Sequence, residues 1–356
     1  METVESINWL KENNLYDSAK TTSYILKKIF IPCLAVKDEK VLIIGDKGAK
    51  DKKISSILAG AYYLAAEELK LNAKLVLQGV KSRGAIADSD VIASLADLEE
   101  GSAVFVTASD KLGSLEGLGK SYRQLCKKRS HKFVSALSLG DLDNGQLSDI
   151  ISAIDVNYPL LKIQHDKLKA LLDNGNELHI TTKSGTDISC GIKGMQAVSA
   201  DGNYTQPGTG GNLPAGEVYI PPNGKNVNGR VVIDGSSRNH KHTRLIKEPI
   251  KLQIEEGKVI SIEGGEEAEQ LEQALSWAET NSKYPGSVRR VGEFGIGLNP
   301  KAKIIGSTLV DEKALGTAHI GIGSNYWFGG NIYAIIHLDQ IFKDPEIKID
   351  GELLKI

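Results

Sequence analysis

The sequence predicts an α/β protein: a doubly wound, mostly parallel sheet domain at residues 1–170, followed by an α+β domain at residues 171–356. The length of 356 residues exceeds the size at which a single hydrophobic core stops growing. In the first half strand-like and helix-like segments alternate, which predicts a parallel sheet covered on both faces. From about residue 172 glycine becomes frequent, strand-like segments shorten and turn dipeptides multiply.

The elements of the first half follow from the spacing of apolar residues. Helices are indicated where apolar residues recur every three or four positions, and strands where short β-branched runs end in a turn. Strands are expected at Lys40–Gly45, Ala73–Leu77, Ala103–Thr107 and Lys132–Ala136, and helices at Ile54–Leu69, Val91–Leu98, Lys120–Lys128 and Leu160–Leu172. The turn from Gly45 to Gly48 lacks both GxGxxG and GxxxxGK[ST], so a plain strand–helix turn is favoured over a nucleotide site.

The second half has the pattern of short strands joined by tight turns. Leu178–Thr182 and Thr186–Cys190 predict one hairpin. The segment KLQIEEGKVISIEGG alternates apolar and polar residues about Glu255–Gly257 and predicts a second hairpin. Val231–Ile233 continues the β pattern, and Ala268–Thr280 has the apolar spacing of a helix.

Composition excludes several classes of protein. The net charge of −2 lacks the basic excess of a nucleic-acid binder. No apolar run approaches the roughly 20 residues that span a bilayer, and the polar N-terminus lacks a secretory pattern. Three cysteines without CxxC spacing fit a reduced compartment. We therefore expect a cytoplasmic protein with neither a nucleic-acid nor a membrane partner.

Three segments of the second half carry the candidate chemistry. They are GNLPAGE ending at Glu217, VGEFGIGLNP around Glu293, and the long segment Asp311–Asp339. In the last of these, His337 and Asp339 stand two apart, so on a strand both side chains point to one face. For any one of these residues an ordinary role is the simpler interpretation, such as a hydrogen-bonded core histidine or a glutamate paired with Arg289 or Arg290.

The combination favours a metal site. Glutamate is rarely buried unless it is paired or coordinates an ion, and Glu217 and Glu293 lie among glycines and apolar residues. With His319, His337 and Asp339 they form an oxygen and nitrogen donor set without thiolate, which suits Zn, Co or Mn. So many ligands are enough for two ions that share a carboxylate.

A second histidine-bearing stretch is the run Arg238–Arg244, which contains His240 and His242. Its neighbours are charged and polar, so a solvated loop is the simpler interpretation. A role of this run in lining a substrate cleft or in binding an anion stays open.

The motifs GNLPAGEVYIPP, GEFGIGLNP and GTAHIGIGSNY…GG…HLD resemble the M29 aminopeptidases, the aminopeptidase T or thermophilic metalloprotease family, over roughly residues 205–350. The resemblance implies a homodimeric hydrolase that cleaves N-terminal peptide bonds of a peptide substrate with two divalent metal ions (Zn, Co or Mn). It also implies catalytic roles for Glu217, Glu293 and Tyr326. By resemblance the metal ligands are Glu217, Glu293, His319, Tyr326, His337 and Asp339.

The chain departs from the family pattern in two places. It has Gly216-Glu217 where two adjacent acids are usual, and the span from Tyr326 to His337 is shorter than expected. Two other functions therefore remain. One is a ring-cleaving dioxygenase of the same fold group, in which His319, His337 and Asp339 bind a single non-heme Fe(II). The other is a binding protein that keeps the fold without turnover.

Overall fold

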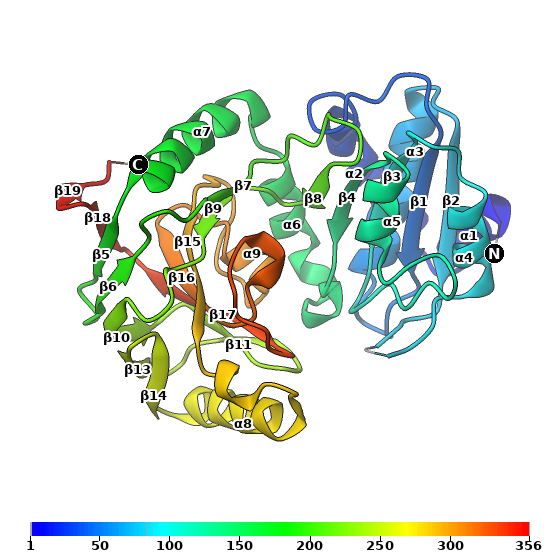
Figure 1. Ribbon diagram of the computed structural model, residues 1–356. Coiled ribbons are helices and arrows are strands. Elements are labelled where there is room, and N and C mark those ends of the chain that lie inside the picture. The colour runs from blue at the N-terminus through cyan, green and yellow to red at the C-terminus, as the bar shows by residue number, and fades with distance from the viewer. Residues whose placement is uncertain (1, 83, 356) are drawn as a thin grey trace. The chain divides into compact units, whose positions relative to one another are not determined.

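The computed structural model describes residues 2–82 and 84–355 and divides them into two compact units (Figure 1). The first unit comprises the residues up to Pro159 together with Gly202–Ala215, and the second comprises Leu160–Asp201 and the residues from Gly216 onward. The chain therefore passes from one unit to the other three times. The division into domains at residue 170 stays a prediction.

The first unit is built on a parallel sheet with the strand order β2-β1-β3-β4-β8. Every neighbouring pair in it is parallel. The first four strands are rich in Val, Ile, Leu and Phe, which pack well on a sheet buried on both faces. The bounds are β1 Val41–Asp46, β2 Ala73–Gln78, β3 Ala103–Thr107, β4 Lys132–Ala136 and β8 Gly210–Asn212. The predicted mostly parallel sheet is confirmed.

Successive strand residues point to opposite sides of the sheet, so the apolar strands present an apolar face on each side. Helices cover both faces. On one face Leu42 and Ile44 share a core with Val91 of α4 and Leu125 of α5. On the other face the ring of Phe105 lies 4.8 Å from that of Tyr62 in α3. The helices are α1 Thr3–Glu12, α2 Tyr16–Leu26, α3 Ile54–Glu68, α4 Ser89–Ala96, α5 Tyr122–Lys128 and α6 Leu147–Ile154, with 3₁₀ turns η1 Lys27–Ile29, η2 Leu139–Asp141 and η3 Asn144–Gln146.

The second unit contains two antiparallel sheets of seven strands each, with orders β14-β13-β10-β6-β5-β18-β19 and β12-β11-β17-β16-β15-β9-β7. The first sheet uses β5 Glu177–Thr181, β6 Asp187–Gly191, β10 Val227–Ile233, β13 Ile250–Glu255, β14 Lys258–Glu263, β18 Glu346–Ile349 and β19 Glu352–Leu353. The second uses β7 Val198–Ala200, β9 Glu217–Ile220, β11 Ser236–Arg238, β12 Thr243–Leu245, β15 Val291–Gly297, β16 Thr317–Gly323 and β17 His337–Lys343. The expected α+β architecture is confirmed.

Both predicted hairpins form. Strands β5 and β6 pair antiparallel, as do β13 and β14. The second turn places Glu256 and Gly257 at φ of 45° and 75°, the left-handed conformation that tight hairpins require.

Helices complete the second unit: α7 Tyr158–Asn174, α8 Glu266–Asn281 and α9 Thr308–Asp311, with η4 Pro285–Ser287 and η5 Tyr326–Phe328. Helix α8 contains the helix predicted at 268–280, and α7 contains the connecting helix. Within the described residues, no helix combines the length and apolar character needed to cross a membrane.

Candidate metal centre

One face of the second sheet gathers the residues singled out from the sequence. Gly321 of β16 pairs with Glu293 of β15 on one side and with Asp339 of β17 on the other. Side chains two residues apart share a face, so His319 and His337 project beside them. Glu217, at the start of β9, pairs with Gly297 of β15, four residues after Glu293. The strands lie side by side in Figure 1.

The glycines of these strands make room for the imidazoles. A Cβ added at Gly295 would lie 2.2 Å from Cε1 and Nε2 of His319. A Cβ at Gly321 would lie 2.7 Å from Cε1 of His337 and 2.9 Å from Cβ of Glu293. The motifs GEFGIG and AHIGIG thus put acids, imidazoles and glycines on the site face. Their Phe and Ile residues alternate onto the opposite face, which is also buried.

The acids and imidazoles converge. His319 Nε2 lies 3.1 Å from Glu293 Oε1 and 3.6 Å from Glu217 Oε2. His337 Nε2 lies 3.4 Å from Glu293 Oε2 and 3.0 Å from Asp339 Oδ1. All five residues are buried except His337, whose side chain is 19% exposed. The structure therefore brings together five of the six predicted ligands.

Three overlapping groups of side chains have ligand atoms within 4.8 Å of one another. They are Glu217 with Glu293 and His319, Glu293 with His337 and Asp339, and Glu312 with His319 and Asp339. Among the described residues, no such group contains both histidines. Asp339 and Glu293 each share a group with either imidazole, so they are the carboxylates that connect the two histidines.

Unsatisfied atoms indicate that the cluster is built for an additional partner. Glu217 Oε2 and His319 Nδ1 are buried and have no hydrogen bond. Buried polar atoms are costly when left unpaired. His337 Nδ1 donates to the Ser324 carbonyl at 2.8 Å, which leaves Nε2 directed at the acids as a potential ligand. These donors fit a divalent first-row transition metal.

The electrostatics of the cluster are strongly coupled. Burial lowers the pKa of His337, but the nearby Asp339 carboxylate outweighs it and raises the pKa to about 10. Burial likewise opposes protonation of His319, and the Glu293 and Glu217 carboxylates raise its pKa to about 9. Burial raises the pKa of Glu293. A metal ion must displace these imidazole protons, so its affinity decreases as the pH is lowered.

Two residues of the site were missed in the sequence. Glu312 and Lys313 follow α9 and are both buried, with Lys313 fully enclosed. The Lys313 ammonium lies 2.5 Å from Glu217 Oε1 and also pairs with Glu312. The only signal was the charged run Asp311-Glu312-Lys313 before an apolar stretch, and such runs are usually solvated.

Tyr326 is far more exposed than the five clustered residues. Its side chain on η5 is 53% exposed, and its ring stacks on Tyr333 at a centroid distance of 4.9 Å. Its role as a ligand or catalytic group stays a prediction. Instead the neighbouring rings border the cluster, because Trp327 lies 5.1 Å and Phe328 6.2 Å from the His337 imidazole.

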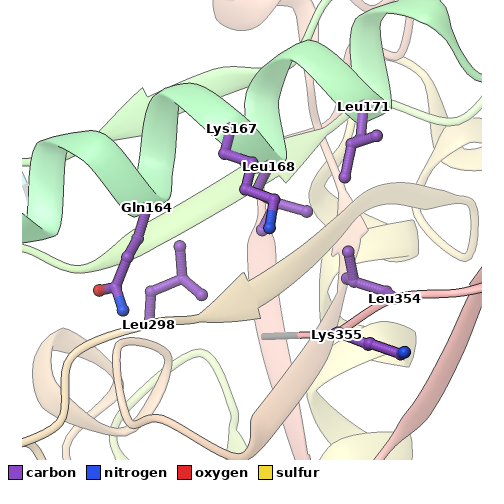
Figure 2. Close-up of a pocket in the computed structure, with 7 residues that line it drawn as sticks. All are labelled: Gln164, Lys167, Leu168, Leu171, Leu298, Leu354 and Lys355. Carbon is purple, nitrogen blue, oxygen red and sulfur yellow. The ribbon is translucent and has the colours of Figure 1, made fainter.

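The other residues singled out from the sequence make their contacts outside this cluster. The His240 ring stacks on Trp277 of α8 at 4.9 Å, so it packs on a helix and is not simply solvated. Arg289 pairs with Glu272 and Glu279 and not with the site glutamates. A separate pocket of about 140 Å³ lies along α7 and is drawn in Figure 2. It is lined by Gln164, Lys167, Leu168, Leu171, Leu298, Leu354 and Lys355, none of which is a candidate ligand.

Comparison with known proteins decides the family. The family model described as NicX, 2,5-dihydroxypyridine 5,6-dioxygenase, matches residues 159–355. The chain belongs to the NicX family. A 2,5-dihydroxypyridine 5,6-dioxygenase of Pseudomonas putida KT2440 is 27% identical over 193 residues, which are 52% of this chain and 54% of that protein. The alignment thus spans about half the length of this relative.

Solved structures show the fold of the NicX-family chain. The structure of 2,5-dihydroxypyridine dioxygenase from Pseudomonas putida KT2440 has a TM-score of 0.69 and 19% identity, and the match covers 95% of each chain. AmpT from Thermus thermophilus has a TM-score of 0.62 and 15% identity, covering 97% of this chain and 100% of that one. The M29 resemblance therefore holds for the fold.

The aminopeptidase interpretation is wrong. The NicX family model and the dioxygenase relative both point to an oxidoreductase in place of a hydrolase acting on peptides. The motifs misled because they describe a sheet face that carries acids, imidazoles and glycines, and such a face can serve more than one chemistry. Side chains that could hold a metal ion lie close together, as expected. The expected two ions of Zn, Co or Mn stay a prediction.

Proposed function

We propose that the protein is a metal-dependent dioxygenase that opens a hydroxylated aromatic ring, a nitrogen heterocycle of the 2,5-dihydroxypyridine kind. The observation that carries this proposal is the cluster of His319, His337 and Asp339 on one sheet face, with Glu293 between the imidazoles. Two imidazoles and one carboxylate are the set that non-heme iron oxygenases use. Membership of the NicX family supports this choice over hydrolysis.

In this proposal His319, His337 and Asp339 hold one Fe(II) ion. The ion, when bound, supplies the activation of dioxygen that ring opening requires. The Ser324 carbonyl keeps the His337 imidazole in the orientation in which Nε2 is the ligand.

The chain's other residues bind and orient the substrate. The Trp327 and Phe328 rings beside His337 offer aromatic surface against which a planar ring can pack. Glu293 lies next to both imidazoles, and burial raises its pKa. It is therefore suited to hold the proton that a ring hydroxyl releases. The enclosed sheet face excludes water from this exchange.

Metal analysis and oxygen uptake test the proposal together. Protein purified without chelator and loaded with Fe(II) under argon should contain iron and consume dioxygen with 2,5-dihydroxypyridine, while the ring absorbance is lost. His337→Ala and Asp339→Asn should lose iron and oxygen uptake in parallel. His179→Ala, a half-exposed histidine on β5, is the matched control and should keep both.

The outcomes separate the alternatives. A D339N protein with full iron content and full ring cleavage would refute this ligand assignment. Hydrolysis of aminoacyl chromogenic amides by the metal-loaded protein would restore the peptidase interpretation. Binding of the heterocycle without oxygen uptake in the iron-loaded protein would favour the non-catalytic homologue.

A further inference from the structure

A row of aromatic rings leads from the surface of the second unit to the candidate centre. The ring centroids of Tyr284 and Tyr333 are 6.3 Å apart, and Tyr333 stacks on Tyr326 at 4.9 Å with an angle of 16° between the rings. Tyr326 contacts Trp327 edge-on at 5.6 Å, and Trp327 lies 5.1 Å from the His337 imidazole. We call Tyr284, Tyr333, Tyr326 and Trp327 the aromatic row. Its inner end lies against a residue that is proposed to hold the metal ion.

The aromatic row is largely open to solvent. Its four residues are between 49% and 54% exposed. In the part of the chain that the structure describes, the other exposed aromatic residues are Tyr24 and Trp277, so most of the exposed aromatic surface gathers here. A contiguous exposed apolar patch marks a surface that binds a ligand or a partner.

A buried asparagine holds the segment that carries most of the row. Asn325 is 1% exposed, its side-chain amide donates to the Gly292 carbonyl of β15 at 2.8 Å, and its side-chain oxygen accepts from the Ile332 N–H at 2.8 Å. A Cβ added at Gly330 would lie 2.0 Å from Cγ of Asn325, so this position requires glycine. The turn between β16 and β17 is therefore fixed beside Glu293. A surface that is already ordered costs less entropy when it binds a ligand.

Continuity with the centre indicates which ligand the row would take. In the proposed function, a planar ring packs against Trp327 and Phe328 beside His337. A group attached to that ring and extending along the row would meet Tyr326 and then Tyr333. Flat aromatic groups make offset and edge-on contacts with such rings, which add to the free energy gained from buried area alone. A second aromatic ring is therefore the group that this surface suits best.

We propose that the aromatic row is an outer subsite for a second aromatic ring of the substrate. The inference rests on the proposed function and adds the substrate class, a hydroxylated nitrogen heterocycle that carries an aryl substituent. The hydroxylated ring lies at the centre, and the outer ring lies on Tyr326 and Tyr333. The occupant of the row is thus part of the substrate and not a second copy of the chain.

Ligand binding under argon tests the subsite without turnover. In a Trp9→Phe/Trp277→Phe protein the one remaining tryptophan is Trp327, so its fluorescence reports on a ring bound at the inner end of the row. With Fe(II)-loaded protein, 2,5-dihydroxy-3-phenylpyridine should bind about tenfold more tightly than 2,5-dihydroxypyridine. The 3-cyclohexyl analogue, which is similar in size but not flat, should gain about threefold or less.

Variants in the same background assign the preference to particular rings. Tyr326→Leu and Tyr333→Leu keep apolar bulk and remove the ring, so each should weaken binding of the phenyl compound by about fivefold or more, and by more than it weakens binding of 2,5-dihydroxypyridine. Tyr333→Phe should keep the tenfold preference, because the ring and not the hydroxyl group makes the contact. Tyr24→Leu, at an exposed tyrosine of the other unit, is the matched control and should also keep it.

The possible results separate the subsite from the function on which it rests. Equal affinities for the phenyl, cyclohexyl and unsubstituted compounds, or a tenfold preference that persists in both Y326L and Y333L, would overturn the subsite. Gel filtration in which these variants dissociate an oligomer would also overturn it, because the row would then be an interface between copies of the chain. Failure to bind any of the three compounds would refute the heterocycle site and the subsite with it. The expected preference without oxygen uptake, once air is admitted, would support the subsite and refute the dioxygenase activity alone.

Discussion

Glycine at positions 295 and 321 determines where the two imidazoles of the cluster can lie. Each glycine stands directly against a histidine ring, on the same sheet face and one strand away. Neither has a left-handed φ, so the requirement is for space and not for backbone freedom. These two glycines of the sequence are therefore required by the packing of the site histidines.

Gly321→Ala should weaken metal binding by about ten- to hundredfold, because the new Cβ would press on the His337 ring and on Glu293. Titration of the stripped protein with Co(II) measures the change. Gly286→Ala is the matched control, since nothing lies within 4 Å of the added Cβ, and it should bind as the wild type does. Wild-type affinity in G321A would show that the His337 ring has room to move.

At the scale of the element, the pleat of three neighbouring strands assembles the site. Strands β15, β16 and β17 contribute Glu293, His319 and the His337/Asp339 pair at alternate positions. The period of two is local and is visible in the sequence, which is why H-x-D could be placed on one face. The register that aligns Glu293, Gly321 and Asp339 in one row is a property of the paired strands.

Helix α7 carries a buried group with a predictable response to pH. His165 is fully enclosed, with Nδ1 3.0 Å from Ser199 Oγ. Burial, followed by the charge of Lys313, lowers its pKa from 6.5 to about 4. Below pH 6.5 His165 becomes protonated in the unfolded chain, whereas in the folded chain it stays neutral until the pH approaches 4. The folded state therefore carries no penalty from this group above pH 6.5 and loses stability as the pH falls toward 4.

His165→Gln should therefore flatten the pH dependence of unfolding. Relative to the wild type, the variant should lose up to about 3 kcal/mol less of its free energy of unfolding between pH 7 and pH 4. Urea denaturation at several pH values measures the difference, with His179→Gln, at a half-exposed histidine, as the control. Identical slopes in H165Q and wild type would contradict the neutral buried imidazole.

At the scale of the whole molecule, the candidate centre belongs to one of two compact units. All five clustered residues and Lys313 fall in the unit formed by Leu160–Asp201 and the residues from Gly216 onward. The NicX family match, residues 159–355, covers this unit almost entirely and leaves out most of the parallel-sheet unit. Each unit has a core of its own.

We expect metal to stabilise one unit selectively. At a free ion concentration about 100 times the dissociation constant, binding adds about 2.7 kcal/mol to the unit that holds the site. Calorimetry should resolve two transitions, of which only one rises, by about 5 °C or more, on metal addition. Trp277 and Trp327 report on the metal-binding unit in a Trp9→Phe protein. A single transition that shifts as a whole would argue against separate units.

The sequence by itself determined the alternation that builds the parallel sheet, the hairpins and the gathering of Glu217, Glu293, His319, His337 and Asp339. These features depend on local periods and on residue types that are costly to bury singly. Only the tertiary structure decided that Glu312 and Lys313 are enclosed beside Glu217, and that Tyr326 faces outward. Burial and pairing of such residues depend on strands and loops distant in the chain, so no local pattern records them. The choice between hydrolysis and ring opening needed the family match, because both chemistries draw on the same donors.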